Sequence, residues 1–142
     1  MITFFIPFYN EEKKSKKNLK LFLSDLKKFI KHPSNKNNYF FFYNDGSVDN
    51  TEFYLKKLID LFKSNKVSLI NNSQNKGVGH SFKKAVKKCK TKFIFFLPGD
   101  NDLNIKKDLI NLNKFCRWDL TFFCPINYEK YSTARYFLSM AF

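Results

Sequence analysis

The chain is poor in the residues that mark several classes of protein. Its 142 residues include only three cysteines, two histidines, four glycines and four prolines. The cysteines, at positions 89, 116 and 124, have no CxxC spacing. They therefore indicate small buried side chains in a reducing compartment, and neither a disulfide framework nor a cysteine-based metal site. His32 and His80 are isolated in the sequence, which excludes a histidine cluster for a metal.

Acidic residues are also scarce. The chain has 12 Asp and Glu residues against 26 Lys and Arg residues, which gives a formal net charge of +14 at pH 7. Lysine far outnumbers arginine, as an AT-rich genome would produce, so one interpretation is lysine spread over solvated helix faces. The other is a surface that attracts anions, such as a nucleotide diphosphate or an acidic membrane. No nucleic-acid-binding module is recognisable, so we expect no nucleic-acid partner.

Long apolar segments are absent as well. No run is long enough to span a bilayer, and no signal peptide precedes the first strand pattern. We therefore expect a cytoplasmic protein, either free or peripheral on the inner face of the membrane. The hydrophobic content of 44% and the aromatic content of 19% are typical of a globular chain with one core.

Strand and helix patterns alternate along the chain. Strands are predicted at 2–6, where Pro7 ends the run, and at 39–43, 67–70, 93–97 and 120–123. Helices are predicted at 13–31, from 49 to 62, from 77 to 89, at 105–115 and from 131 onward, the third with Phe82, Ala85, Val86 and Cys89 facing inward. Repeated β-α units with almost continuously apolar strands predict an α/β fold, a mostly parallel sheet with helices on both faces.

Polar segments follow three of these strands. They are Tyr9–Glu11, Asn44–Ser47 and Asp100–Asp102. Ligands of parallel α/β sheets bind at the carboxyl ends of the strands, so these segments predict a site at one edge of the sheet.

Each candidate residue has a chemical and a purely structural interpretation. Asp100 and Asp102 offer hard oxygen ligands for Mg²⁺ or Mn²⁺, which would neutralise a leaving diphosphate, or they form a turn that caps the next helix. Asp45, before Gly46, can accept hydrogen bonds from a nucleobase, or it belongs to the turn that enters the next helix. The Gly77-Val78-Gly79 segment presents backbone N–H groups to phosphate, or its glycines allow close packing of helix on strand.

Four segments in order resemble the motifs of family 2 glycosyltransferases. ITFFIPFYNEE at 2–12 is similar to "IPxYNEE", and YNDGSVDNT at 43–51 is similar to "DDGSxDNT". NKGVG at 75–79 looks like "NxGxG", and FFLPGDND at 95–102 occupies the place of the D-x-D motif. The likeness is closest to the polyprenyl-phosphate (dolichol-phosphate-mannose-synthase-like) branch, whose interfacial helix the segment 135–139 also resembles.

The resemblance implies a GT-A fold, which is Rossmann-like, and a set of site residues. Pro7, Tyr9 and Glu11 would line the base and ribose pocket, Tyr43 and Asp45 would contact the base, and Asp100 and Asp102 would hold the metal and the diphosphate. Three positions depart from the family pattern: Asn44 replaces the first aspartate, Pro98-Gly99 precedes the D-x-D motif, and the arginine expected near Cys124-Pro125 is missing.

The resemblance also implies an activity and a domain plan. Residues 1–124 would form the nucleotide-sugar-binding domain and 125–142 the start of an acceptor-side or interfacial helix, with the fold incomplete at the C-terminus. The expected activity is metal-assisted transfer of a sugar from a nucleotide-diphosphate sugar to a lipid-phosphate acceptor, such as a polyprenyl phosphate, or to a glycan. The alternative is a non-catalytic remnant that binds a nucleotide or a partner. No residue is assigned as the catalytic base.

Overall fold

A computed structural model describes residues 1–101 and 105 of the chain. Its four strands are β1 (Ile2–Phe8), β2 (Tyr39–Asn44), β3 (Val67–Asn71) and β4 (Phe93–Phe96). All pair in parallel, in the order β3-β2-β1-β4, which confirms the predicted α/β class and parallel sheet. The predicted strand at 120–123, the helix from 131 and the domain division after residue 124 fall outside the described residues, as does the 105–115 helix beyond Ile105.

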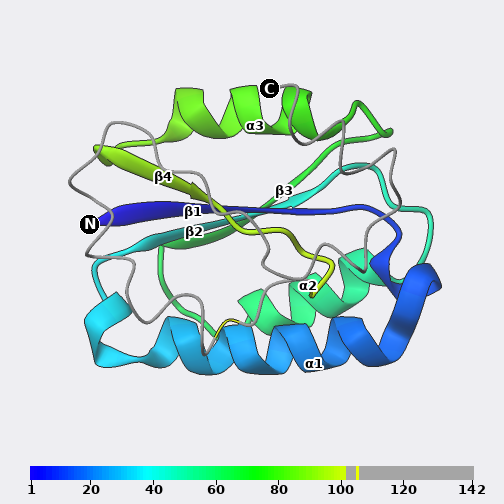
Figure 1. Ribbon diagram of the computed structural model, residues 1–142, viewed down its shortest axis with the longest axis horizontal. Coiled ribbons are helices and arrows are strands. Elements are labelled where there is room, and N and C mark those ends of the chain that lie inside the picture. The colour runs from blue at the N-terminus through cyan, green and yellow to red at the C-terminus, as the bar shows by residue number, and fades with distance from the viewer. Residues whose placement is uncertain (102–104, 106–142) are drawn as a thin grey trace, which may run out of the picture. The chain divides into compact units, whose positions relative to one another are not determined.

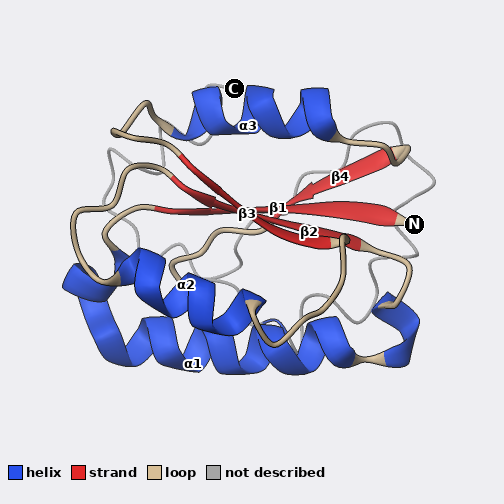
Figure 2. Ribbon diagram, turned by 180° about the vertical axis from the view of Figure 1, so that it is seen from behind, coloured by secondary structure: helices blue, strands red, loops and turns tan. Residues whose placement is uncertain are grey.

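Helices cover both faces of this sheet, as predicted. Helices α1 (Glu11–Lys31) and α2 (Thr51–Ile59) lie on one face, and α3 (Val78–Lys88) lies on the other (Figures 1 and 2). A short 3-10 helix, η1 (Pro33–Asn35), connects α1 to β2. None of the helices within residues 1–101 combines the length and the apolar character needed to cross a membrane.

Aromatic rings form most of the core beneath α1. The ring of Phe4 stacks on that of Phe40 with centroids 4.9 Å apart, and its edge meets Phe29 of α1 at 5.4 Å. Phe8 similarly contacts Phe22 of α1. Burial of each such side chain contributes about 1.5–3 kcal/mol, so these rings are a main source of the stability that holds the strand ends in place.

Strand β1 runs through Pro7, so the prediction that this proline ends the strand is wrong. Pro7 pairs with Tyr43 in the ladder, and β1 continues to Phe8. The backbone of Phe5 faces β4, because its carbonyl accepts a hydrogen bond from the N–H of Leu97. The backbone of Pro7, two residues on, faces the same side, where pairing with β4 has already ended at Phe5. The missing N–H of the proline therefore removes no ladder hydrogen bond.

Two helix predictions also need correction. Helix α1 begins at Glu11 instead of residue 13, and its backbone leaves helical geometry at Ser15 (φ −164°, ψ 99°). The Ser15 hydroxyl accepts a hydrogen bond from the N–H of Asn18 at 3.2 Å and so acts as a new N-cap for the rest of the helix. In α3, Ala85 is buried as predicted, but Val86 is 48% exposed because it lies one residue further around the helix.

Candidate functional site

The carboxyl ends of all four strands lie along one edge of the sheet, and hydrogen bonds join the loops that follow them. The N–H of Asp45 donates to the carbonyl of Phe8, and the N–H of Asn72 donates to the carbonyl of Asn44. The first residue of the loop after β2 is thus bonded to the last residue of β1, and the first residue of the loop after β3 to the last residue of β2. The predicted convergence of polar strand ends on one edge is confirmed for the segments after β1 and β2.

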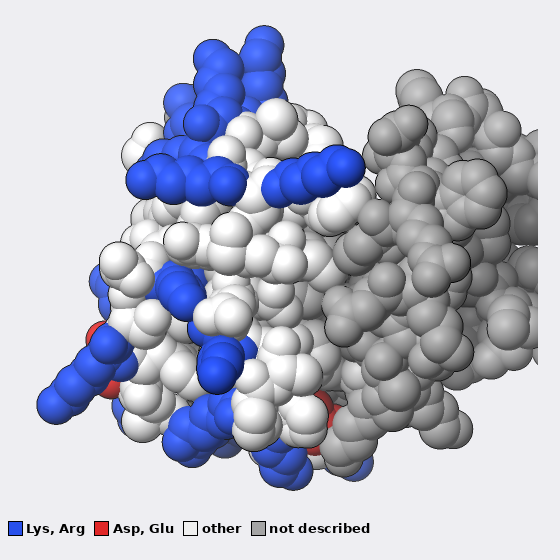
Figure 3. Space-filling view, turned by 90° about the vertical axis from the view of Figure 1, so that its left-hand side faces the viewer, with Lys and Arg blue, Asp and Glu red and all other residues white. Residues whose placement is uncertain are grey.

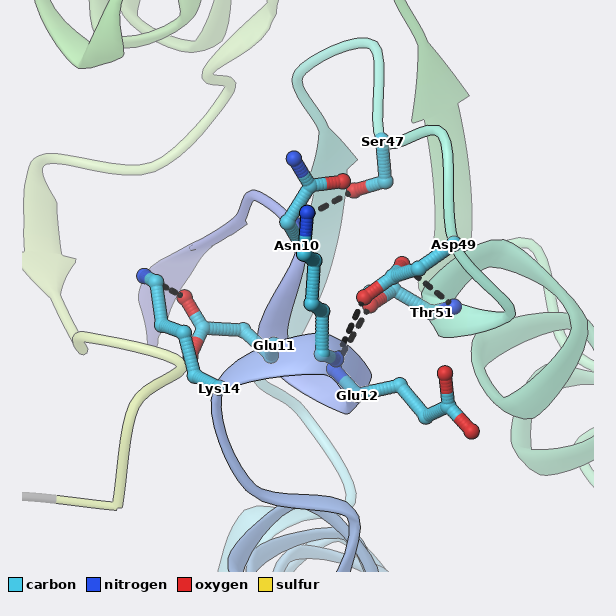
Figure 4. Close-up of polar contacts among 8 residues, drawn as sticks. Asn10, Glu11, Glu12, Lys14, Ser47, Asp49 and Thr51 are labelled. Carbon is cyan, nitrogen blue, oxygen red and sulfur yellow. Dashed lines mark hydrogen bonds and ion pairs between the residues drawn. The ribbon is translucent and has the colours of Figure 1, made fainter.

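Asn10 clamps the loop after β1 to the loop after β2. Its backbone is left-handed (φ 52°), a conformation that asparagine tolerates better than most residues. In this conformation its N–H donates to the Ser47 hydroxyl at 3.0 Å (Figure 4). Its side-chain carbonyl accepts from the N–H of Val48 at 2.9 Å. The YNEE and DGSV segments, whose residues Asn10 and Ser47 are 37 positions apart, are therefore held together at this edge by two hydrogen bonds.

The start of α1 is capped by residues from the second motif, which the sequence analysis did not predict. The N–H of Glu12 donates to the Thr51 hydroxyl at 3.1 Å, and the N–H of Lys13 donates to Asp49 Oδ2 at 2.7 Å (Figure 4). Burial alone would raise the pKa of Asp49, but hydrogen bonds from Thr51 and from the Lys13 N–H outweigh it and hold this pKa below its usual value. Asp49 is therefore a structural cap in its ionised form.

Asp45 is buried and firmly oriented at the end of β2. It is 4% exposed, and its Oδ1 accepts hydrogen bonds from the side-chain amide of Asn72 at 2.6 Å and from the N–H of Lys76 at 3.1 Å. Within residues 1–101, Oδ2 of this carboxylate receives no hydrogen bond. The carboxylate is therefore held from one side, and its second oxygen is the one suited to accept from a ligand.

Gly46 brings the Asp45 loop against the loop after β3. Its φ is +69°, and a Cβ atom added there would lie 2.3 Å from the backbone carbon of Gln74. Only glycine accommodates both the left-handed backbone and this close approach. This contact places the N–H of Lys76 within reach of Asp45.

Asn44 explains one departure from the family pattern. Its side-chain carbonyl accepts from the N–H of Ser47 at 3.2 Å, and its amide nitrogen donates to Glu52 at 3.4 Å. An aspartate here would bring a second carboxylate against Glu52, whereas the amide can both accept and donate. The loss of one charge beside Asp45 therefore has a structural reason.

The predicted residues of β1 and its loop lie at this edge with different exposures. Pro7 is half-buried at the end of β1, and the Tyr9 side chain is 39% exposed. Glu11 is buried, with an ion pair to Lys14 of 2.6 Å between Oε1 and Nζ (Figure 4). Tyr9 thus offers surface to a ligand, whereas the carboxylate of Glu11 is already neutralised within α1.

Tyr43 lies in the core, not on the surface of the site. Its ring is fully buried against Phe5 and Ala85 beneath α3, and its hydroxyl has no hydrogen-bond partner among the described residues. Burial raises the pKa of Tyr43 to about 12. In this arrangement the ring offers no surface to a base, and the sequence pattern of an all-aromatic strand contained no signal that separates a site tyrosine from a core one.

The two predicted metal ligands are only partly described. Asp100 follows β4 in a loop that packs on the end of β1, because a Cβ atom on Gly99 would lie 2.5 Å from the carbonyl oxygen of Pro7. This close contact explains why position 99 is a glycine. Asp102 lies beyond the described part of the chain.

Within the described part, no group of three or more His, Cys, Asp or Glu residues could hold a metal ion. One or two carboxylates with substrate phosphates suffice for Mg²⁺ or Mn²⁺, so the donor chemistry of this loop fits such an ion.

The glycines at the start of α3 do not pack closely against a strand. An added Cβ atom would meet nothing within 4 Å at either Gly77 or Gly79. Gly77 instead supplies a positive φ of +83° that turns the chain into the helix. The interpretation of close helix–strand packing is therefore wrong, and the phosphate interpretation stays a prediction.

Lysine side chains are distributed differently over the helices. In α1 and α2, exposed lysines form ion pairs with nearby acids, such as Lys16 with Glu12 at 3.4 Å and Lys56 with Glu52 at 2.5 Å. Helix α3 contains four lysines and no acidic residue. In the view of Figure 3, blue side chains project from the end where α3 lies. Both α1, with eight lysines against three acidic residues, and α3 therefore carry a net positive charge, and of the three helices only α3 lacks an acidic residue.

The order of the motifs around this edge is matched by a known family. The sequence model described as "Glycosyl transferase family 2" matches residues 3–137. The chain belongs to this family. A search of curated proteins finds no match. The family assignment thus rests on the family model, which spans most of this glycosyltransferase chain.

Solved structures share the fold of this family 2 chain. The S. aureus protein TarS 1–349 in complex with UDP aligns with a TM-score of 0.58 and 20% identity, over 80% of this chain and 32% of that one. The mannosyltransferase PcManGT of Pyrobaculum calidifontis, in complex with GDP-Man and Mn²⁺, aligns with a TM-score of 0.56 and 15% identity, over 70% of this chain and 27% of that one. The present chain thus spans about a third of the length of these structures, and the likeness establishes the GT-A fold.

Proposed function

We propose that the carboxyl edge of the sheet binds a nucleotide-diphosphate sugar and that the protein transfers the sugar to an acceptor. In that reaction the bond between the anomeric carbon and the diphosphate oxygen breaks, and a bond from that carbon to an acceptor oxygen forms. Membership of family 2 supports this reaction class. The complexes of similar structures with UDP, UDP-GlcNAc and GDP-Man support the donor class.

The observation that carries the proposal is the fixed carboxylate of Asp45. A nucleobase with an imide or amino edge needs a preorganised acceptor, and the two hydrogen bonds to Oδ1 hold Asp45 as one. Tyr9, exposed at the end of the neighbouring strand, offers a ring surface beside the ribose and base. Pro7 and Glu11 form the floor of this region in the proposal, through packing and charge balance.

Asp100 and Asp102 are the proposed ligands of Mg²⁺ or Mn²⁺. Such an ion, when bound, offsets the negative charge that develops on the leaving diphosphate. Asp100 follows Gly99, whose backbone packs against Pro7, so the loop that carries this carboxylate lies at the end of β1. The Mn²⁺ complex of the similar mannosyltransferase supports this part of the proposal.

The acceptor belongs to the proposal as well. A lipid phosphate such as a polyprenyl phosphate, or a glycan, would meet the donor at this edge, and a lipid acceptor would bring the protein to the inner face of the membrane. The net positive surface of α3 favours an anionic acceptor or membrane by charge complementarity. The competing function is a domain that binds a nucleotide or a partner without turnover.

A thermal-shift screen tests the proposal. UDP, GDP and their sugars are each added with and without Mn²⁺, since a ligand at 100 times its Kd stabilises the folded state by about 2.7 kcal/mol. We expect one nucleotide to raise the melting temperature more with Mn²⁺ than without it. Asp100→Ala and Asp102→Ala should each remove the Mn²⁺-dependent part, and Asp45→Ala should remove the preference for one base.

Asp60→Ala is the matched control for these variants. Asp60 is an exposed aspartate just after α2, so its loss removes an equal charge away from the strand ends. This substitution should leave the change in melting temperature caused by each ligand the same as in the wild type. A folded wild-type protein that no nucleotide stabilises would refute the donor site, and equal shifts in wild type and both Asp100 and Asp102 variants would refute the metal ligands.

A further inference from the structure

Asn72, at the end of β3, connects three elements of the site through one buried side chain. It is 7% exposed, and its amide nitrogen donates to Asp45 Oδ1 at 2.6 Å and to the Ser81 hydroxyl at 3.1 Å. Ser81 is fully buried in α3. Asn72 therefore ties the loop after β2 to α3 across the end of β3. Nothing in the sequence around Asn72 distinguishes it as a site residue, because a polar residue after a strand is an ordinary loop signal.

The orientation of the Asn72 amide follows from its partners. Its carbonyl oxygen accepts a hydrogen bond from Lys84 Nζ at 2.9 Å. A lysine ammonium can only donate and an ionised carboxylate can only accept, so the carbonyl must face Lys84 and the nitrogen must face Asp45. The Asn72 amide therefore bridges the ammonium group of Lys84 and the carboxylate of Asp45 through one hydrogen bond to each.

This bridge determines where the Asp45 carboxylate points. Asn72 and the N–H of Lys76 both donate to Oδ1, which anchors that oxygen to β3 and the loop that follows it. Rotation of the carboxylate would break two hydrogen bonds to a charged group. Oδ2 is thereby held in a single direction, as it must be to accept hydrogen bonds selectively from one nucleobase.

We propose that Asn72 is the residue that positions Asp45 for recognition of the donor base, with Lys84 as the charge that orients Asn72. This inference rests on the proposed function, because it deepens the role of Asp45 in the donor site. Asn72 acts through Asp45 and need not touch the ligand. Its removal should therefore weaken binding of the nucleoside part and leave the diphosphate part unaffected.

The test is isothermal titration of the full chain, with Mn²⁺, against the preferred nucleoside diphosphate and against inorganic pyrophosphate. Asn72→Ala should weaken nucleoside diphosphate binding about tenfold, the typical effect of losing one hydrogen bond to a charged group. Pyrophosphate binding should be unchanged. In an Asp45→Ala background, Asn72→Ala should have no further effect, because a residue that acts only through Asp45 cannot add to its loss.

Asn71→Ala is the matched control. Asn71 is the preceding residue, exposed, with its amide bonded to Glu52 at 3.1 Å, and its loss should leave both affinities unchanged. Lys84→Met is the second variant, because it keeps Asn72 and removes only the charge behind it. It should weaken nucleoside diphosphate binding in the same direction, about threefold, and it decides the question if Asn72→Ala does not fold.

The outcomes separate this inference from the proposed function. Wild-type protein that binds no nucleoside diphosphate would overturn both. If Asp45→Ala weakens nucleoside diphosphate binding while Asn72→Ala and Lys84→Met leave it unchanged, the positioning role is wrong and the donor site stands. Equal losses for nucleoside diphosphate and pyrophosphate in a folded Asn72→Ala variant would also overturn the positioning role, because they indicate general damage to the edge.

Discussion

Replacing Gly46, in the loop after β2, with alanine should destabilise the protein more than the same change at Gly77 or Gly79. The substitution places a methyl group 2.3 Å from the backbone carbon of Gln74 and 2.5 Å from the backbone nitrogen of Asn75. Both neighbours are backbone atoms, so no side chain can rotate away. The loop that carries Asp45 must then separate from the loop that carries Lys76.

The magnitude has two parts. A non-glycine residue at the positive φ of Gly46 costs about 1–3 kcal/mol in backbone strain. Overpacking of a methyl group into a filled space costs a further 1–3 kcal/mol or so. We therefore expect a loss of about 2–6 kcal/mol, against the total of roughly 5–15 kcal/mol that is usual for a folded domain.

Two other glycines separate these two parts. Gly77→Ala meets the backbone cost alone, because φ is +83° and no atom lies within 4 Å of the added methyl group. Gly79→Ala meets neither cost and lies within α3, so alanine should raise stability by about 0.5 kcal/mol. From most to least stable, the predicted order is Gly79→Ala, wild type, Gly77→Ala and Gly46→Ala.

Urea denaturation followed by circular dichroism measures this series. The slope of the transition should stay constant while its midpoint moves, which shows that stability and not the unfolded state has changed. If Gly46→Ala is no less stable than Gly77→Ala, the close contact between the two loops is refuted. Nucleotide binding of Gly46→Ala, measured below its unfolding transition, should also weaken, because the Lys76 N–H then no longer holds Asp45.

Three further substitutions test other contacts by the same assay. Asp49→Asn should cost about 0.3–1 kcal/mol at pH 7, because asparagine can still accept the capping hydrogen bonds but loses the negative charge beside the N-terminus of α1. Because the pKa of Asp49 is lowered by folding, that difference should persist above the unfolded-state pKa of about 3.9 and disappear as the pH falls through the folded-state pKa. Tyr43→Phe should raise stability by about 1–3 kcal/mol at pH 7, since it removes a buried hydroxyl without a partner among the described residues. Burial raises the pKa of Tyr43 to about 12, so wild type should lose further stability relative to the variant as the pH rises from about 10 toward 12. If the difference in unfolding free energy between Tyr43→Phe and wild type is the same at pH 7 and at pH 11, the buried position of this hydroxyl is contradicted. Phe4→Ala should cost about 3–5 kcal/mol, and a loss below 1 kcal/mol would contradict the packing of Phe4 on Phe29 and Phe40.

The layered fold was predictable because its signals are local. The aromatic run Tyr39–Tyr43 favours a strand covered on both faces, and the helical spacing of Leu19, Phe22 and Leu26 defines the buried face of α1. Strands alternating with helices then leave a parallel sheet as the simplest arrangement. The end of β1 was mispredicted because the effect of Pro7 depends on whether a neighbouring strand still pairs there, which is not a local property.

The location of the candidate site in the sheet was predictable from the sequence, but most contacts of its side chains were not. Parallel strands all end at one edge, so Asp45 and Tyr9 had to lie there whatever their exact environment. The environment of each side chain depends on partners that are distant in sequence. Tyr43 proved to be a core residue because α3 covers that face of β2, and nothing in its own segment distinguishes it from a residue of the site.

The sequence by itself therefore determined the α/β class, the strand order along the chain and the edge that gathers the polar loops, because periodicity and turn residues act over a few positions. Only the tertiary structure decided that Asp49 caps α1 through Lys13, 36 residues away, and that Asn72 holds Asp45 across 27 residues. A hydrogen bond requires its two atoms within about 3 Å. Which distant residues come that close is decided by the packing of the whole sheet and its helices.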